Sequence, residues 1–278
     1  MLALRWGFLV GVGALGLSAA AELSCSTDEF GSTDAGTTAD TSATDALVDS
    51  GTRFCAAHPA AQGTLCDDFE TDYGGGFNPA WALSVNGGTA SREADPPGFV
   101  LHSAFPAVSA KRNAQLAWDP NATVARTVTF STRLKISPSC ADGIGWFSIT
   151  GLVGNAGVAM GLGVATVSAR KEIVLFLGSQ QGDAATATQL ESADDITFDV
   201  WHDVKFELAF DRPLADGGGP NGGVDLTVSV DQKPEITITG GPGGSAIAFP
   251  KFAIGATTST STSTCDLRMD DVLFDLKK

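Results

Sequence analysis

The chain has few basic residues and few charged residues overall. Seventeen Lys and Arg stand against 32 Asp and Glu, which gives a formal net charge of −15 over 278 residues. Nucleic acids and anionic membrane surfaces are bound by clusters of Lys and Arg, so the composition argues against both as partners. An acidic polysaccharide is also a poor ligand unless a local basic patch forms, and the sequence shows no sign of one.

Several motifs of catalysis and metal binding are missing as well. The sequence contains no Cys-x-x-Cys pair, and its three histidines are not at the spacing of zinc ligands. It contains no Gly-x-Ser-x-Gly segment of the kind that presents a nucleophilic serine. His202 lies on the apolar side of its predicted strand, so we interpret it as a core histidine and not as a base.

Only the N-terminus has a long apolar run. Residues 6–21 are apolar, end in small side chains and follow Arg5, which is the only charge among the first 21 residues. This is the pattern of a bacterial secretory signal, and the run is too short for an ordinary membrane span. We therefore assign residues 1–24 to a signal peptide and predict export into a compartment that permits disulfides.

Cys25 closely follows this run and makes the cysteine count odd, at five. Its position resembles that of the lipid-attachment cysteine of bacterial lipoproteins, although Glu22 departs from the usual motif. The alternative is simple cleavage after Ala21. Lipidation of Cys25 leaves four cysteines, which can pair in three ways. We favour a local Cys55–Cys66 bridge and a long-range Cys140–Cys265 bridge.

Residues 25–52 are rich in Ser, Thr, Asp and Ala and carry no basic residue. Such a segment cannot bury enough apolar surface to offset its chain entropy. We predict an extended acidic tether here, followed by one folded domain over residues 53–278.

The folded domain is patterned as strands. From Val204 to Phe210 every second residue is apolar, which is typical of a strand with one buried face. The alternation changes phase at Asp270 and Asp271, as a β-bulge would cause. No amphipathic helix is evident, and residues 184–197 are polar enough to predict a loop with a short strand. The predicted strands cover residues 64–70, 81–85, 98–104, 115–118, 124–136, 145–152, 158–164, 172–177, 200–211, 224–230, 235–239, 249–255 and 265–276.

Three segments resemble the laminin G-like members of the concanavalin A-like lectin/glucanase superfamily. They are Trp-His-Asp-Val from Trp201, Val-Ser-Val-Asp from Val228, and the closing segment with Ile254-Gly255 and Asp270-Asp271-Val272. The resemblance implies an all-β, two-sheet antiparallel jelly-roll sandwich. It also implies that the early Cys66-Asp-Asp-Phe-Glu segment forms a first strand beside the last one.

The same resemblance is nearly silent on activity, because the superfamily holds glycosidases, lyases, lectins and passive modules. The laminarinase-like branch needs a Glu-x-Asp-x-x-Glu strand, which is absent here. Alginate-lyase relatives use Arg, Gln-x-His and a Tyr base, and the only tyrosine in this chain is Tyr73, in a Gly-rich turn. We therefore assign no catalytic residue.

Two sets of residues are candidates for binding. The first is a sugar-stacking platform, with core packing as the alternative; it consists of Trp81, Trp118, Trp146 and Trp201. The second is a structural calcium site, with solvent-facing or backbone-bonded acids as the alternative; it consists of Asp67, Asp68, Asp270 and Asp271. No other cofactor is expected.

The sequence therefore favours a non-catalytic lipoprotein of the cell envelope that displays a lectin-like, glycan-binding domain. It would touch the membrane only through its lipid, at the outer membrane or cell surface, and would be a monomer; without the lipid it would be periplasmic or secreted. One alternative is a glycan-degrading hydrolase or lyase of an unrecognised branch. Another is a purely structural envelope protein.

Overall fold

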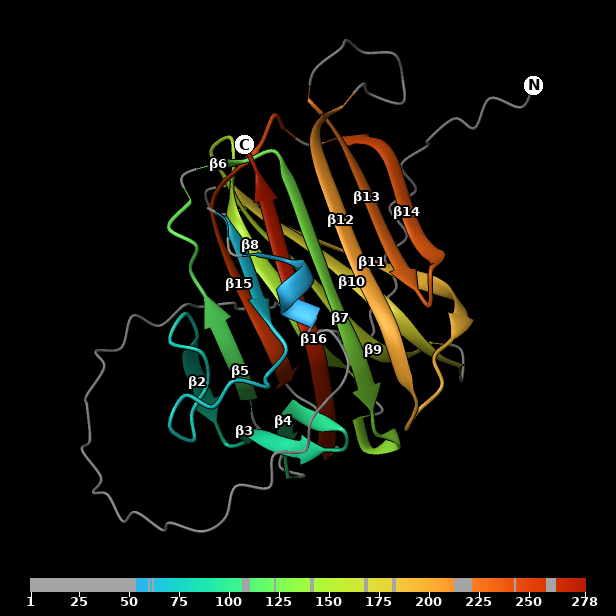
Figure 1. Cartoon of the computed structure of the whole chain (residues 1–278). Helices are drawn as coiled ribbons and strands as arrows, with labels where there is room; N and C mark the ends of the chain where they lie inside the picture. The colour runs from blue at the N-terminus through green and yellow to red at the C-terminus, as the bar shows by residue number, and fades with distance from the viewer. Residues whose placement is uncertain are drawn as a thin grey trace. The chain divides into compact units, whose positions relative to one another are not determined.

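Two antiparallel β-sheets pack face to face in the computed structural model of the chain (Figure 1). The structure describes residues 54–278, except 60, 62, 107–110, 123, 141–142, 168–169, 182–183, 213–221, 243 and 259–263. The predicted signal peptide, Cys25 and the predicted tether lie outside the described residues. Within the described part, no helix is long and apolar enough to cross a membrane.

Sheet A places the last strand of the chain near its centre. Its order is β14 (Lys233–Pro242), β13 (Gly223–Val230), β12 (Trp201–Arg212), β7 (Thr127–Ile136), β16 (Cys265–Lys277), β4 (Gly98–Phe105) and β3 (Thr89–Asp95). The short strand β1 (Thr64–Asp67) pairs with the C-terminal half of β16, beyond the end of β4. The first strand therefore lies beside the last one, as the resemblance implied.

Sheet B covers the other side of the core. Its order is β11 (Ala184–Asp195), β10 (Arg170–Gln181), β9 (Ala156–Val167), β8 (Ile144–Val153), β15 (Ile247–Thr258), β5 (Arg112–Trp118) and β2 (Ala82–Asn86), with β6 (Val124–Ala125) paired to β15. Two short 3-10 turns, η1 (Phe54–Ala57) and η2 (Pro138–Cys140), are the only helical elements among the described residues. The predicted jelly-roll sandwich is confirmed.

The core forms where the inward faces of the two sheets meet. Val128, Phe130 and Leu134 of β7 alternate inward and are fully buried. At the centre, Phe274 of β16 lies between rings from both sheets, with centroids 4.9 Å from Phe130 and from Phe252. Aromatic burial of this kind contributes more than any other single term to such a core.

The predicted phase change in the last strand is a β-bulge. The register of β16 against β7 shifts between Asp270 and Leu273, and Asp271 has a positive φ of 51°. The buried Thr132 donates its hydroxyl to the carbonyl of Asp270 at 2.8 Å, which holds the bulge from the core side. The bulge lets residues on both sides of it alternate correctly toward the core.

Three local predictions were wrong. Residues 184–195 form the 12-residue edge strand β11 and not mainly a loop, because pairing with β10 outweighs their weak apolar pattern. The strand β3 was missed, since an edge strand with Arg92 and Glu93 carries little apolar signal. Residues 124–136 are not one strand: the chain leaves sheet B after β6 and enters sheet A with β7, on either side of Arg126.

Small residues on β9 let the strands of sheet B approach closely. A Cβ on Gly163 would lie 2.5 Å from the carbonyl oxygen of Ile144 on the neighbouring strand β8. This distance is far inside van der Waals contact, so strand packing requires glycine at that position.

Both predicted disulfides are present. Cys55–Cys66 joins η1 to β1, and Cys140–Cys265 joins η2, just after β7, to the start of β16. Their presence agrees with folding in an oxidising compartment.

Candidate functional site on the outer face of sheet A

Three of the four candidate tryptophans belong to the core. Trp81, Trp118 and Trp146 are at most 8% exposed. Trp81 and Trp118 pack against Phe274, and Trp146 packs against Phe130. The predicted stacking platform is therefore wrong for these three, because their ring faces are used by the core. Trp201 is half-buried and remains available to a ligand.

The four candidate aspartates of the predicted calcium site have different partners in the structure. Asp67 lies on the core side, where it accepts hydrogen bonds from Trp81 Nε1 at 2.7 Å and from the Phe69 amide at 2.9 Å. Asp68 accepts from the amides of Cys55 and Glu70. In the part of the chain that the structure describes, no group of three or more His, Cys, Asp or Glu side chains is arranged to hold a metal. The calcium site stays a prediction, and Asp67 is its weakest member.

Asp270 and Asp271 face a common partner because of the bulge. Arg133 Nη1 lies 3.4 Å from Asp270 Oδ2 and 3.8 Å from Asp271 Oδ2. Side chains of consecutive residues in a regular strand point to opposite faces, and the positive φ of Asp271 breaks that rule here. Two more groups of β12 adjoin Arg133: its cross-strand partner is Asp203, and its guanidinium lies 5.0 Å from the Trp201 ring centroid. We call these five residues the Asp270 cluster.

The charges of this cluster shift its ionisation. Burial and repulsion from Asp271 raise the pKa of Asp270 to about 7, although Arg133 opposes the shift. Burial also raises the pKa of Asp271, again against Arg133 and with repulsion from Asp68 added. Glu70 contributes repulsion to both carboxyls. Asp270 is thus a carboxyl that holds a proton close to neutral pH, which is the property of a general acid.

A second polar group lies next to the Asp270 cluster. Cross-strand pairing aligns His102 of β4 with Arg268 of β16, Arg268 with Lys135 of β7, and Lys135 with Trp201 of β12. This row of four lies two residues along the strands from the row of Asp270, Arg133 and Asp203, which corresponds to about 7 Å. Two cations, one imidazole and one aromatic ring therefore cross the middle of sheet A.

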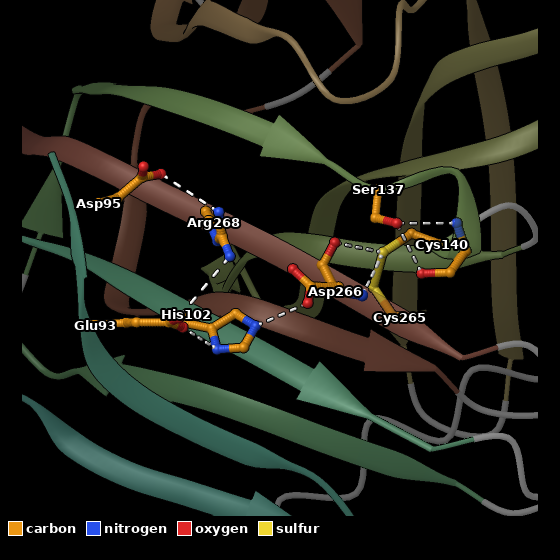
Figure 2. A network of polar contacts seen from close by, with 9 residues as sticks. Glu93, Asp95, His102, Ser137, Cys140, Cys265, Asp266 and Arg268 are labelled. Atoms are coloured by element: carbon orange, nitrogen blue, oxygen red, sulfur yellow. Dashed lines mark hydrogen bonds and ion pairs between the residues drawn. A yellow bond between two sulfur atoms is a disulfide. The ribbon is translucent and has the colours of Figure 1, made fainter.

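His102 is the centre of a network of polar contacts (Figure 2). Its Nδ1 lies 2.6 Å from Glu93 Oε2, and its Nε2 lies 3.1 Å from Asp266 Oδ2. Arg268 approaches Asp95 at 3.6 Å and Glu93 at 3.9 Å. Figure 2 shows the Cys140–Cys265 disulfide beside Asp266, so the covalent link anchors one end of the network.

A shallow hollow opens at the edge of this network. It has a volume of about 260 Å³ and is lined by Lys135, Ser137, Asp199, Asp266 and Arg268. A second hollow, of about 210 Å³, lies at the end of β4 between Gly87 and Pro106. Both are smaller than the usual pocket for a whole small-molecule ligand.

One row of residues across sheet B consists mostly of small side chains. Along one row the cross-strand partners are small: Ala117 of β5, Ala253 of β15, Ser148 of β8 and Gly161 of β9. Only at β10 does the row end in a large exposed residue, Phe176. This row of sheet B therefore carries no acid–base side chain, in contrast to the two polar rows of sheet A.

His202 lies in the sandwich and not on either polar row. Its side chain is buried, with Nδ1 2.8 Å from Asp231 Oδ2 and Nε2 2.8 Å from the Thr197 carbonyl. Both ring nitrogens are thus occupied, as the interpretation of a core histidine requires.

Arg133, Lys135 and Asp203 alternate with apolar residues in the sequence, which is typical of the outer face of a strand. The sequence contained no signal that β7, β12 and β16 are neighbours. The basic patch that composition argued against therefore arises only when Arg133, Lys135 and Arg268 meet across β7 and β16.

Comparison with known proteins supports the fold and leaves the activity open. No family model matches the chain, and no curated protein matches it. Among solved structures, an alginate lyase from Chlorella virus superimposes with a TM-score of 0.53 at 11% identity, covering 71% of this chain and 93% of that one. An endo-β-1,4-glucuronan lyase from the fungus Trichoderma reesei gives 0.51 at 8% identity, covering 72% and 92%.

A glycoside hydrolase family 16 endo-glucanase from Bacteroides ovatus gives a TM-score of 0.52 at 11% identity, covering 77% of this chain and 99% of that one. At such identities the likeness is one of fold. The shared fold is a two-sheet jelly roll, and these three similar structures are glycan-degrading enzymes.

Proposed function

We propose that this domain degrades glycan chains bound across the outer face of sheet A, with Asp270 as the proton donor. The observation that carries the proposal is the pair of consecutive carboxyls at the β16 bulge, one of which stays protonated up to about pH 7. Glycosidic bonds are cleaved by paired carboxyls, one of which protonates the leaving oxygen. The jelly-roll likeness to two lyases and a glucanase supports the same class of activity.

The neighbouring groups have roles that fit this chemistry. Asp271 is the second carboxyl, and Arg133 orients both acids through its Nη1. Trp201 offers a half-exposed ring on which a sugar face can stack. A polysaccharide needs no deep pocket, because it lies along an open surface and contacts several residues at once.

The test is a cleavage assay of the full-length mature protein on β-glucans, polyglucuronate and alginate. New reducing ends report hydrolysis, and an unsaturated product absorbing in the ultraviolet reports elimination. We expect Asp270→Asn to lower the rate by about 10²- to 10⁴-fold, as loss of a general acid does. Activity of the unmodified enzyme should fall as pH rises through about 7, where Asp270 loses its proton.

The matched control is Asp275→Asn, which removes a carboxyl of the same strand that lies beside Lys277 and outside the cluster. This variant should keep the activity of the unmodified protein. Unchanged cleavage in Asp270→Asn, or no cleavage of any glycan in the panel, would sink the proposal.

Glycan binding without cleavage is the second candidate. The shallowness of both hollows favours it. In this case the mature protein binds a glycan of the panel without cleaving it. The Asp270→Asn variant then binds the same glycan at the same concentration as the unmodified protein. Binding that disappears on chelation would support a calcium ion at Asp68, Asp270 and Asp271. Silence toward every glycan would favour a structural role in the envelope.

Lipid attachment at Cys25, and with it display at the cell envelope, is a proposal based on the N-terminal sequence. Mass spectrometry of the mature N-terminus tests it. A diacylglyceryl-modified Cys25 is expected, and a chain beginning at Glu22 would contradict it.

A further inference from the structure

The hollow of about 260 Å³ beside the Asp270 cluster contains a cation without an ionic partner. Within the described part of the chain, no carboxylate forms an ion pair with Lys135. Two of the other three charged groups of the hollow already have ionic partners, whereas Asp199 has none among the described residues. Asp266 lies against His102 at 3.1 Å, and Arg268 lies against Asp95 at 3.6 Å.

Lys135 also faces a like charge. It is the direct cross-strand partner of Arg268, and Arg133 is two residues away on the same face of β7. Like charges directly opposite each other destabilise an antiparallel pair. Such a pair is unexpected in a chain that has 32 acidic side chains and only 17 basic ones to neutralise. An anion between the two cations would remove this repulsion.

The size and lining of the hollow limit what that anion can be. The volume holds one charged group and not a whole sugar chain. Lys135, the guanidinium of Arg268 and the hydroxyl of Ser137 are all donors, which matches the several acceptor oxygens of a carboxylate or sulfate. Asp199 and Asp266 also line the hollow, so the bound group must contact the three donors and stay away from these two carboxylates.

We infer that the hollow between Lys135 and Arg268 binds an oxyanion substituent of the glycan, a carboxylate or a sulfate ester. The inference rests on the proposed function and names its substrate class. With the anion at Lys135, the glycan extends along the strands toward the row of Asp270, and the two rows are about 7 Å apart. Anionic glycans are then preferred even though the protein as a whole carries a net charge of −15.

The test compares binding of four polymers to the full-length mature protein at fixed ionic strength: polyglucuronate, dextran sulfate, neutral dextran and cationic polyglucosamine. We expect one or both of the anionic polymers to bind at least about tenfold more tightly than dextran, with the preference shrinking as salt is raised. Preference for polyglucuronate assigns a carboxylate, and preference for dextran sulfate assigns a sulfate.

Lys135→Gln should reduce the preference for the anionic polymer by about five- to tenfold. Its matched control is Lys205→Gln, a lysine on the same face of sheet A that is paired with Glu207 at 2.8 Å. The control should stay within about twofold of the unmodified protein. Arg268 is left unmutated because its ionic contacts support the fold.

Three results would overturn the inference: equal binding of neutral dextran, tightest binding of polyglucosamine, or an unchanged preference in Lys135→Gln. Failure here is distinct from failure of the proposed function. If Asp270→Asn abolishes cleavage of a neutral glycan, the function stands and the anion site falls. If Lys135→Gln loses an anionic preference but no glycan is cleaved, the anion site stands as part of a binding surface.

Discussion

Asp270 and Asp271 follow each other in the chain, yet both carboxylates reach the same guanidinium nitrogen of Arg133, at 3.4 and 3.8 Å. The bulge in β16 makes this possible, and the amide of Asp271 donates to Asp270 Oδ1 at 2.8 Å. One cation thus serves two acids, with Asp68 and Glu70 adding further negative charge. The pKa values of Asp270 and Asp271 are therefore raised, and the stability of the fold should depend on pH.

Asp270 should make the protein less stable as pH rises from about 4 to about 7. Because its folded-state pKa is raised to about 7, the native protein binds more protons than the unfolded chain in this interval. Asp271 and Asp67 shift in the same direction, mainly through burial. Asp270→Asn, which mimics the protonated form, should therefore raise the free energy of unfolding by about 1–3 kcal/mol at pH 8 and change it little at pH 4.

Denaturant unfolding at the two pH values measures this difference. Asp275→Asn is the control, and its effect should be similar at both. An Asp270→Asn variant that is less stable than the unmodified protein at pH 8 would mean that the charged carboxylate is stabilising, and that its ionisation has been assigned the wrong direction.

Gly163→Ala should destabilise the domain by about 1–3 kcal/mol, since the new methyl group would overlap the Ile144 carbonyl. Gly157→Ala is the matched control on the same strand, because its nearest atom would lie 3.8 Å away. Thermal unfolding compares the two variants. Equal melting temperatures would show that β8 and β9 separate easily, and that the close approach is not required.

The two disulfides should contribute unequally to stability. Cys140–Cys265 spans 125 residues, whereas Cys55–Cys66 spans 11. In the chain-entropy model the longer loop gains about 4–5 kcal/mol and the shorter one about 3. Replacing both cysteines of each pair by serine, followed by denaturant unfolding, tests the ranking. A larger loss from the short bridge would indicate that native-state contacts of η1 outweigh the loop entropy.

Substitution of Trp201 should affect glycan binding, whereas substitution of Trp118 should affect the stability of the fold. Trp201→Ala should weaken glycan binding by about tenfold or more while costing less than about 1 kcal/mol of stability, because the ring is only half-buried. Trp118→Ala should cost about 3–5 kcal/mol, since the ring stacks on Phe252 at 5.4 Å within the core. Titration of a bound glycan and urea unfolding supply the two readouts. Unaltered affinity in Trp201→Ala would remove this residue from the site.

Much of the fold could be read from local pattern. Alternation placed Val204, Phe206 and Leu208 on the buried face of β12, and the phase change at Asp270 located the bulge. The cysteine pairs were also predicted correctly. The alternation and its change of phase depend on near neighbours in the chain, so the sequence expresses them directly. The Cys140–Cys265 pair joins residues 125 positions apart and was chosen among three possible pairings. Edge strands such as β3 and β11 were harder to predict from the sequence. An edge strand pairs on one side only and has many polar residues, so its apolar pattern is weak.

The candidate site was much less visible. Tryptophans can line a sugar platform or fill a core, and only the packing of both sheets around Phe274 assigned Trp81 and Trp118 to the core. Lys135 and Arg268 are 133 positions apart in the printed sequence, and their meeting depends on the order of strands in sheet A.

By itself, the sequence determined the buried faces of strands such as β7 and β12 and the position of the bulge in β16, because the alternation of apolar and polar residues is a local property of an extended backbone. Only the tertiary structure decided which charges become neighbours. Coulomb interactions depend on distance in space, and strand order brings residues from β4, β16, β7 and β12 within reach of one another.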